Sequence, residues 1–434
     1  MVGLTARPLA RSEEALLYLI RSASRPSTLG SLVAALLASS ALALGCSSTS
    51  NDTHALAGGG GSGGAGSIAS SSSGPPPSGP DCATLAPTCF ASQQGCVEAN
   101  GAASCVSCDD GQYAAPSGTC EPIPGTAVSH DFPDQTVQAG EEQLGNCRSW
   151  TLGNDTDLYV NAVELSQSEQ SHHSNWTWVP EDSFPGADGI WPCGNRSYDF
   201  YSGVAAGGVV YSQSTQAVHE VQKFRDGAVV RIPAHSKLIS DIHLLNTTGQ
   251  AVTGHAHLTL YSLAEADVKI KLGTFHLEYD ALDIPPHSSV RYTGQCSVAA
   301  AYEDATKQPF SPSVYYLLPH THTLATAFFA RVLGGPNDGS SLLDLGSYSG
   351  EAHGRAFDPP ISLAGADGIE FGCQYTNPRS DSVGWGFGDQ EMCELFGFAD
   401  LSSFLQARVN VATPNGDDGS VELFDGPCSV ELPK

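Results

Sequence analysis

The stretch Ile232-Pro233-Ala234-His235-Ser236-Lys237-Leu238 is echoed later in the chain by Ile284-Pro285-Pro286-His287-Ser288-Ser289-Val290. In both copies proline is followed by small and polar residues and then by an apolar segment, which is typical of a turn that leads into a β-strand. The echo predicts two domains of similar design, one after the other in the chain. Their boundary is expected near Ala264.

Short segments rich in β-branched and aromatic residues follow one another after Ile123. Clusters of Gly, Pro, Asn and Asp separate these segments, and no amphipathic helix of four turns is visible. The pattern predicts an all-β region of two tandem antiparallel β-sandwiches, jelly-roll-like in arrangement, over residues 125–263 and 264–434. The expected strands are 158–163, 229–232, 237–246, 257–261, 268–279, 313–318, 326–333, 369–376, 407–412 and 421–424.

Composition limits the possible partners. The chain has 434 residues, with 19 Lys and Arg against 46 Asp and Glu, and a net charge of −27. Nucleic acid and anionic membrane surfaces are poor partners for such a chain, because like charges repel. Low charge density (15%), 47 Gly and 27 Pro favour a turn-rich, exported protein, and the 13 cysteines favour an oxidising compartment.

The N-terminal segment predicts export. An uncharged, Ala- and Leu-rich stretch at 32–45 follows Arg21 and Arg25 and is too short to span a bilayer, which is typical of a signal peptide over residues 1–46. Its end, Ala43-Leu44-Gly45-Cys46, resembles a bacterial lipoprotein processing site, which implies lipidation of Cys46. The protein is then expected to be an outer-membrane lipoprotein whose lipid is its only membrane contact. Simple secretion to the extracellular space is the alternative.

Two segments follow that cannot build a core of their own. Residues 47–80 are nearly all Gly, Ser, Ala and Pro, which predicts a flexible tether. Residues 81–124 hold six cysteines and few large apolar groups, so we expect a small module held by three disulfides. A zinc site from Cys105 and Cys108 is a less favoured alternative, because export would oxidise these thiols. The six cysteines are Cys82, Cys89, Cys96, Cys105, Cys108 and Cys120.

Histidines at metal-binding spacings are the main functional signal. His320 and His322 flank Thr321 at the end of an expected strand, where residues i and i+2 point to the same face and both imidazoles can reach one ion. The adjacent pair His172-His173 needs a bulge or loop to converge on one ion. His243 stands alone within an apolar strand.

Methionine adds a second signal. The chain has two methionines, and one of them is the initiator, so Met392 is the single methionine after export. A core filled with Leu, Val and Phe has little use for one thioether. Two imidazoles and a thioether form a soft, neutral ligand set that favours Cu(I) over zinc.

Together with the cysteines near them, these residues form a pattern that resembles a known protein family. His320-Thr321-His322, then Cys373, then a Gly-Phe-Gly run ending in Glu391-Met392-Cys393, resemble the C-terminal domain of the copper type II, ascorbate-dependent monooxygenases, the family of dopamine β-monooxygenase and peptidylglycine α-hydroxylating monooxygenase. The resemblance covers roughly residues 131–428. It implies that His320, His322 and Met392 hold the copper that activates oxygen.

The same resemblance implies a second copper, held by His172, His173 and His243, that supplies electrons drawn from ascorbate or another reductant. His257 is the alternative to His243. The expected activity is hydroxylation of a C–H bond of a small organic substrate with O₂, in the cleft between the two sandwiches. The resemblance also implies three disulfides, which pair Cys147 with Cys193, Cys296 with Cys428, and Cys373 with Cys393.

Departures from the family pattern narrow the function. Leu318 stands where the peptidylglycine enzyme has an arginine that grips the substrate carboxylate, so the likeness is closer to the dopamine enzyme. Ser174 follows the His-His pair, where the family commonly has Met.

A non-catalytic copper- or ligand-binding surface protein is therefore the alternative function. A blue-copper electron carrier, which needs a free thiolate such as Cys393, is disfavoured. Oligomeric state is left open.

Overall fold

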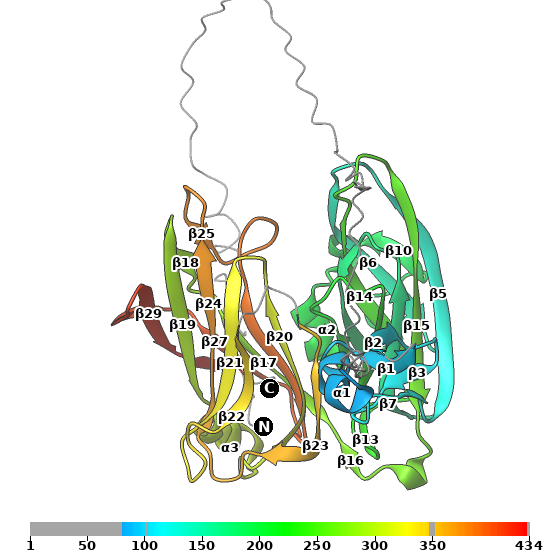
Figure 1. Ribbon diagram of the computed structural model, residues 1–434. Helices are drawn as coiled ribbons and strands as arrows, with labels where there is room; N and C mark the ends of the chain where they lie inside the picture. Colours follow the sequence, from blue (N-terminus) through cyan, green and yellow to red (C-terminus); the bar gives the residue numbers. More distant parts are fainter. Residues whose placement is uncertain (1–79, 100–101, 347–351, 432–434) are drawn as a thin grey trace, which may run out of the picture. The chain divides into compact units, whose positions relative to one another are not determined.

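Four six-stranded sheets, paired as two β-sandwiches, form most of the chain (Figure 1). The computed structural model describes residues 80–99, 102–346 and 352–431. The expected signal peptide, Cys46 and the tether before Pro80 lie outside these ranges. The all-β prediction is confirmed, and pairing is antiparallel except between β13 and β16, β17 and β27, and β19 and β29.

The first sandwich contains two sheets whose apolar faces share one core. One sheet has the order β10-β6-β14-β9-β11, with β8 paired to β14. Its strands are β6 (Glu142–Thr151), β8 (Ser171–His173), β9 (Asn175–Pro180), β10 (Gly189–Pro192), β11 (Gly208–Ser212) and β14 (Ser236–Leu245). The other has the order β16-β13-β7-β15-β5, with β12 paired to β7. Its strands are β5 (Thr126–Val137), β7 (Leu158–Gln167), β12 (His219–Lys223), β13 (Ala228–Ile232), β15 (Val252–Ser262) and β16 (Ile270–Lys271).

The second sandwich repeats the design with its own core. One sheet runs β23-β20-β26-β17-β27-β30. Its strands are β17 (Gly273–Tyr279), β20 (Ser313–Thr321), β23 (Arg355–Ser362), β26 (Cys393–Ala399), β27 (Leu405–Val409) and β30 (Ser429–Glu431). The other runs β22-β21-β24-β19-β29-β28. Its strands are β19 (Ser288–Ser297), β21 (Ala325–Leu333), β22 (Ser341–Gly346), β24 (Gly368–Asn377), β28 (Thr413–Asp418) and β29 (Val421–Pro427).

Short elements join these sheets. Helices α2 (Phe200–Ala206) and α3 (Ala299–Thr306), two 3₁₀ turns (Cys193–Arg196 and Glu265–Asp267) and the pair β18 (Asp283–Ile284) and β25 (Val383–Gly384) lie in the connections. The expected single strand over 268–279 is divided, because Ile270 and Lys271 pair with β13 of the first sandwich before the chain enters β17 of the second. The strand pairing thus changes sandwich after Lys271 rather than near Ala264.

The echoed stretches form the same turn in both sandwiches. His235 and His287 each adopt a positive φ, of 56° and 52°, a backbone conformation that histidine tolerates better than most residues. In each turn the serine that follows donates from Oγ to the proline carbonyl two positions before the histidine, over 2.8 Å. The turns lead into β14 and β19, as the echo predicted.

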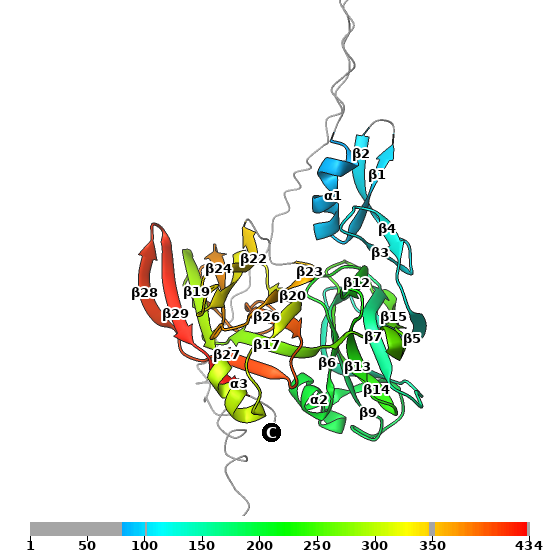
Figure 2. The same ribbon diagram turned by 90° about the horizontal axis from the view of Figure 1, so that it is seen from below.

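The cysteine-rich module consists of helix α1 (Cys82–Ala91) and two hairpins, β1 (Gln94–Ala99) with β2 (Ala102–Ser107), and β3 (Gln112–Ala114) with β4 (Cys120–Pro122). Its three disulfides, Cys82–Cys96, Cys89–Cys105 and Cys108–Cys120, confirm the disulfide prediction and contradict the zinc alternative. The module packs beside β12 of the first sandwich, where Val221 donates its backbone N–H to Gln93 Oε1 over 2.9 Å (Figure 2).

Apolar side chains join the two sandwiches. The core of the first sandwich extends to five buried side chains of β20 and β26 in the second. These are Tyr315, Tyr316, Leu318, Phe396 and Phe398. Strand β20, which carries the His-Thr-His motif, thus has one face against its own sandwich and the other against the first sandwich. This packing brings the candidate ligands of the two sandwiches together.

Candidate metal centre

The His-Thr-His pair lies at the end of β20. His320 Nδ1 is 3.1 Å from Ser214 Oγ, and His322 Nδ1 is 2.7 Å from the carbonyl oxygen of Gln390. The Nε2 atoms of both rings are buried and have no hydrogen-bond partner within the described part of the chain. A buried polar nitrogen without a partner costs free energy, and a metal ion is one group that removes this cost.

The loop that carries Met392 is attached to this strand end. The Glu391 carboxylate, 1% exposed, accepts hydrogen bonds from the backbone N–H groups of His322 at 2.9 Å and Leu324 at 2.7 Å. Burial raises the pKa of Glu391 to about 7, against the effect of these hydrogen bonds. Met392 is buried next to it, and its backbone oxygen accepts from the Tyr375 hydroxyl. Glu391 therefore connects the methionine loop to the His322 turn.

His172, His173 and His243 converge in the first sandwich. β8 pairs with β14 through His173 and His243, and the register shifts between His243 and Leu244. This irregularity allows the adjacent histidines to face one neighbour, as the sequence required. Each of the three rings offers a nitrogen within 4.8 Å of the other two. The convergence expected for this trio is therefore present.

Hydrogen bonds orient these three rings as well. His243 Nε2 is 2.7 Å from Glu142 Oε1, and its Nδ1 is 3.3 Å from His173 Nε2. His172 Nδ1 is 2.6 Å from Gln216 Nε2. A carboxylate on the far nitrogen of an imidazole is a frequent feature of metal sites, because it fixes the tautomer and directs the other nitrogen to the ion.

The two ligand groups overlap. His173 belongs to the first sandwich, and His320 and His322 belong to the second. One ring nitrogen of each of these three histidines lies within 4.8 Å of the other two. The ring centroids of His173 and His320 are 4.9 Å apart. The sequence predicted two separate sets of ligands, whereas the structure places five histidines in two groups that share His173.

The electrostatic environment favours neutral imidazoles. Burial is the main cause that lowers the pKa of each ring, and neighbouring histidines lower several of them further. The pKa of His172 falls to about 4, and those of His173 and His320 fall well below the usual value. The neutral form is the one that binds metals.

A row of polar side chains, buried at Glu394 and Glu278 and half-buried at Arg408, continues from His320 across the sheet. The strand register sets Glu394 opposite His320, Glu278 opposite Glu394, and Arg408 opposite Glu278. Tyr201, from α2 of the first sandwich, donates its hydroxyl to Glu278 over 3.0 Å. Burial raises the pKa of Glu394 to about 8 and that of Glu278 to about 7. The row links the two sandwiches beside the histidine cluster.

The three disulfides implied by the family resemblance are present: Cys147–Cys193, Cys296–Cys428 and Cys373–Cys393. They indicate an exported protein. Because Cys393 is bonded to Cys373, it offers no thiolate, and the blue-copper alternative loses its ligand.

His257, the alternative to His243, lies elsewhere. Its Nδ1 is 2.7 Å from the exposed Asp131 carboxylate, and it belongs to none of the metal-compatible groups among the described residues. Sequence reasoning missed the partners that orient the rings, notably Glu142 and Ser214. They lie 101 and 106 positions from their histidines, and no local pattern identifies them.

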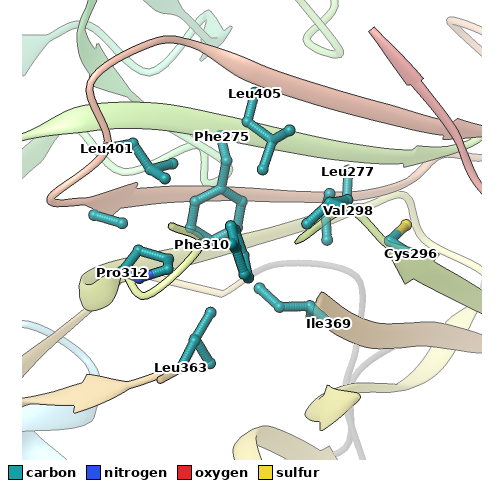
Figure 3. A pocket seen from close by; sticks show the side chains of 11 residues that line it. Phe275, Leu277, Cys296, Val298, Phe310, Pro312, Leu363, Ile369, Leu401 and Leu405 are labelled. Atoms are coloured by element: carbon teal, nitrogen blue, oxygen red, sulfur yellow. The ribbon is translucent and has the colours of Figure 1, made fainter. Parts of the chain in front are cut away.

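Two cavities differ greatly in size. An apolar cavity of about 10 Å³ lies inside the second sandwich, where Phe275, Phe310 and Val298 are among the lining side chains, and has room for at most one water (Figure 3). A cleft of about 940 Å³ is lined by parts of the module and of both sandwiches, including His219 and Tyr316. Its volume is that of a small-molecule site.

Comparisons with known proteins add little to this geometry. No protein-family model and no curated protein matches the sequence. Similar solved structures include the major capsid protein P2 from bacteriophage PM2, with 8% identity over 62% of this chain and 98% of that chain and a TM-score of 0.29. Another is the PBSX exported protein XepA, with 9% identity over 66% and 92% and a TM-score of 0.17. TM-scores this low carry no information on function. In the described part of the chain, no helix combines the length and hydropathy of a membrane span.

Proposed function

We propose that the protein is a copper-dependent monooxygenase that hydroxylates a C–H bond of a small organic substrate, with O₂ and ascorbate or another one-electron reductant. The observation that carries the proposal is the cluster of His173, His320 and His322, in which two buried Nε2 atoms lack a partner among the described residues. Copper bound there would supply the activation of O₂ and the transfer of single electrons.

The donor set fits copper. His320 and His322 are held through Nδ1 by Ser214 and by a backbone carbonyl, which leaves Nε2 for the ion. Low pKa values keep the rings neutral, so no proton competes at neutral pH. With the Met392 thioether, proposed as the third ligand, the set is soft and uncharged, which suits Cu(I).

The second set, His172, His173 and His243, is proposed to hold the other copper. Glu142 accepts from Nε2 of His243 in the tautomer that leaves Nδ1 free, and Nδ1 faces His173 Nε2 over 3.3 Å. A hydrogen bond between these two nitrogens needs one proton, which His173 Nε2 can supply. A copper ion bound by both nitrogens would take the place of that proton.

The disulfides support export, and we further propose that Cys46 carries a lipid that anchors the protein to a bacterial outer membrane. A tether of residues 47–80 would then hold the sandwiches away from the membrane surface.

The overlap at His173 favours a second candidate function, a non-catalytic copper-binding protein. If His173, rather than Met392, completes the set of His320 and His322, the other group keeps only His172 and His243. The chain then binds one copper rather than two, and the electron-supplying site is absent. Copper stoichiometry therefore separates the two candidates.

The test is to load purified full-length protein with Cu(I), count bound copper, and follow ascorbate-dependent O₂ uptake with a panel of small substrates. We expect two coppers per chain and uptake that is lost in His320→Ala and in Met392→Leu. The control is His255→Ala, which removes an exposed histidine outside both groups. One copper without uptake would support the binding protein. Copper binding that is insensitive to His320→Ala would refute the ligand assignment.

A further inference from the structure

A third group of metal-compatible side chains lies away from the histidine cluster, where the cysteine-rich module meets the first sandwich. Asp110 comes from the loop before β3 of the module, Glu164 from β7 and His219 from β12. Each offers one ligand atom within 4.8 Å of the others. His219 Nε2 is 2.8 Å from Glu164 Oε1 and 4.0 Å from Asp110 Oδ1.

The buried member of the group is held rigidly. Glu164, 4% exposed, accepts from the Tyr261 hydroxyl at 2.6 Å through Oε2 and from the Gly111 backbone N–H at 2.8 Å through Oε1. Metal-binding carboxylates are commonly fixed by such hydrogen bonds. These contacts fix the Glu164 carboxylate, whose Oε1 faces His219 Nε2.

The charges of the group are unbalanced. The carboxylates of Asp110 and Glu164 share the single imidazole of His219. The Asp110 side chain is 92% exposed, and in the described ion pairs its cationic partner is His219, with Nε2 4.0 Å from Oδ1. Protonation of His219 balances only one of the two negative charges. A divalent cation in the same position would balance both and leave the imidazole neutral.

The donor chemistry differs from that of the histidine cluster. Zn²⁺ binds both imidazole nitrogen and carboxylate oxygen, and three protein ligands leave its fourth position for water. Cu(I) prefers imidazole, thioether and thiolate donors and has little affinity for carboxylate oxygens. The two kinds of site should therefore select different ions in the same chain.

We propose that Asp110, Glu164 and His219 bind one Zn²⁺-type divalent cation, which fastens the cysteine-rich module to the first sandwich. The module already contacts this sandwich through Tyr113, whose ring lies 4.7 Å from Lys223 Nζ, and through Ile123, packed with Ala162 and Tyr261. The cation adds a cross-link between the loop that holds Asp110 and two strands. Because His219 also lines the cleft of about 940 Å³, the cation sits at the edge of that cleft.

The test uses the full chain with His173→Ala and His320→Ala, which disable the histidine cluster. Zn²⁺ bound after dialysis is counted by elemental analysis, and its affinity is measured by competition with a chelating dye. We expect one zinc per chain in this background. Asp110→Asn and His219→Gln should each weaken zinc binding at least tenfold. Asp109→Asn, a change of the exposed neighbouring acid, is the matched control and should bind normally.

A second readout addresses the module. Zinc should slow proteolytic release of the module in the background protein and in Asp109→Asn, but not in Asp110→Asn. Asp110 is exposed, so its substitution preserves the fold and a loss of binding reports on the site. Absence of a zinc equivalent in the background protein would overturn the proposal. Equal zinc binding in all variants would do the same. Zinc that needs His219 but not Asp110 would refute the link to the module.

Discussion

Substitution of Ser214 by alanine should weaken copper binding without unfolding the protein. Ser214 Oγ is the partner of His320 Nδ1, and the serine is 4% exposed, so no bulk water replaces the lost hydroxyl. With a metal on Nε2, the ring proton must lie on Nδ1 and would be left buried without an acceptor. A bound metal ion polarises this N–H, so the lost acceptor costs more in the metal-bound state than in the metal-free state. The cost therefore falls mainly on the metal-bound state.

The expected loss of copper affinity follows from the usual effect of removing a hydrogen bond to a metal-bound histidine. Loss of a hydrogen bond to a metal-bound histidine lowers metal affinity about 10- to 100-fold. This corresponds to about 1.4 to 2.7 kcal/mol, within the range of about 1–3 kcal/mol for a buried donor left unsatisfied. We therefore expect Ser214→Ala to raise the Cu(I) dissociation constant by one to two orders of magnitude.

The assay is competition for Cu(I) against a chromophoric chelator, with the midpoint of urea unfolding measured in parallel on the metal-free protein. Ser212→Ala is the matched control, because Ser212 is fully buried in the same segment and its Oγ has no partner in the described structure. Unchanged affinity in Ser214→Ala would refute the role of His320 Nε2 as a ligand. An equal loss in Ser212→Ala would attribute the effect to packing.

Three further predictions concern the contacts that hold this site. Tyr201→Phe removes the hydrogen bond to Glu278 between the sandwiches and should lower the free energy of unfolding by about 1–2 kcal/mol, measured by urea denaturation; no change would show that the contact is dispensable. The raised pKa of Glu394 means that the folded chain keeps a proton that the unfolded chain releases, so stability should fall as pH rises from about 4.5 to about 8. Glu394→Gln should flatten that part of the melting-temperature profile, and an unchanged slope would contradict the assignment. Replacing Cys147 and Cys193 together by alanine opens a loop with a sequence separation of 46 and should cost about 4 kcal/mol in thermal or urea unfolding, whereas an intact midpoint would contradict the chain-entropy estimate.

Local patterns in the sequence determined the fold class and the convergence of one histidine pair. Alternation of apolar residues depends on neighbours two positions apart, so the strands around His243 and His320 were predicted within a few residues. The His-Thr-His spacing predicted that His320 and His322 converge, because the side-chain period of a strand is two, and both rings lie together at the end of β20. The echoed Pro-x-His-Ser turn indicated two sandwiches. The structure has the same backbone conformation at both copies, with a positive φ at His235 and His287.

Local sequence patterns alone could not predict which cysteines pair or which histidines lie together in the cluster. The family resemblance implied all three long-range disulfides, and the structure contains them. His173 meets His320 because the two sandwiches pack through apolar side chains of β20 and β26. The alternation of apolar residues predicts that these side chains are buried, but it does not predict which sheet they contact. The sequence therefore gave no sign that one histidine would be shared by both groups.

Strand register decided the remaining features. Glu142 lies 101 positions from His243, and Asp110 lies 54 and 109 positions before Glu164 and His219; these distances along the chain carry no spacing signal. Only the tertiary structure brings such residues within hydrogen-bonding or metal-binding reach. The physical reason is that hydrophobic patterning specifies which face of a strand is buried, whereas contacts across sheets and between domains depend on register and packing.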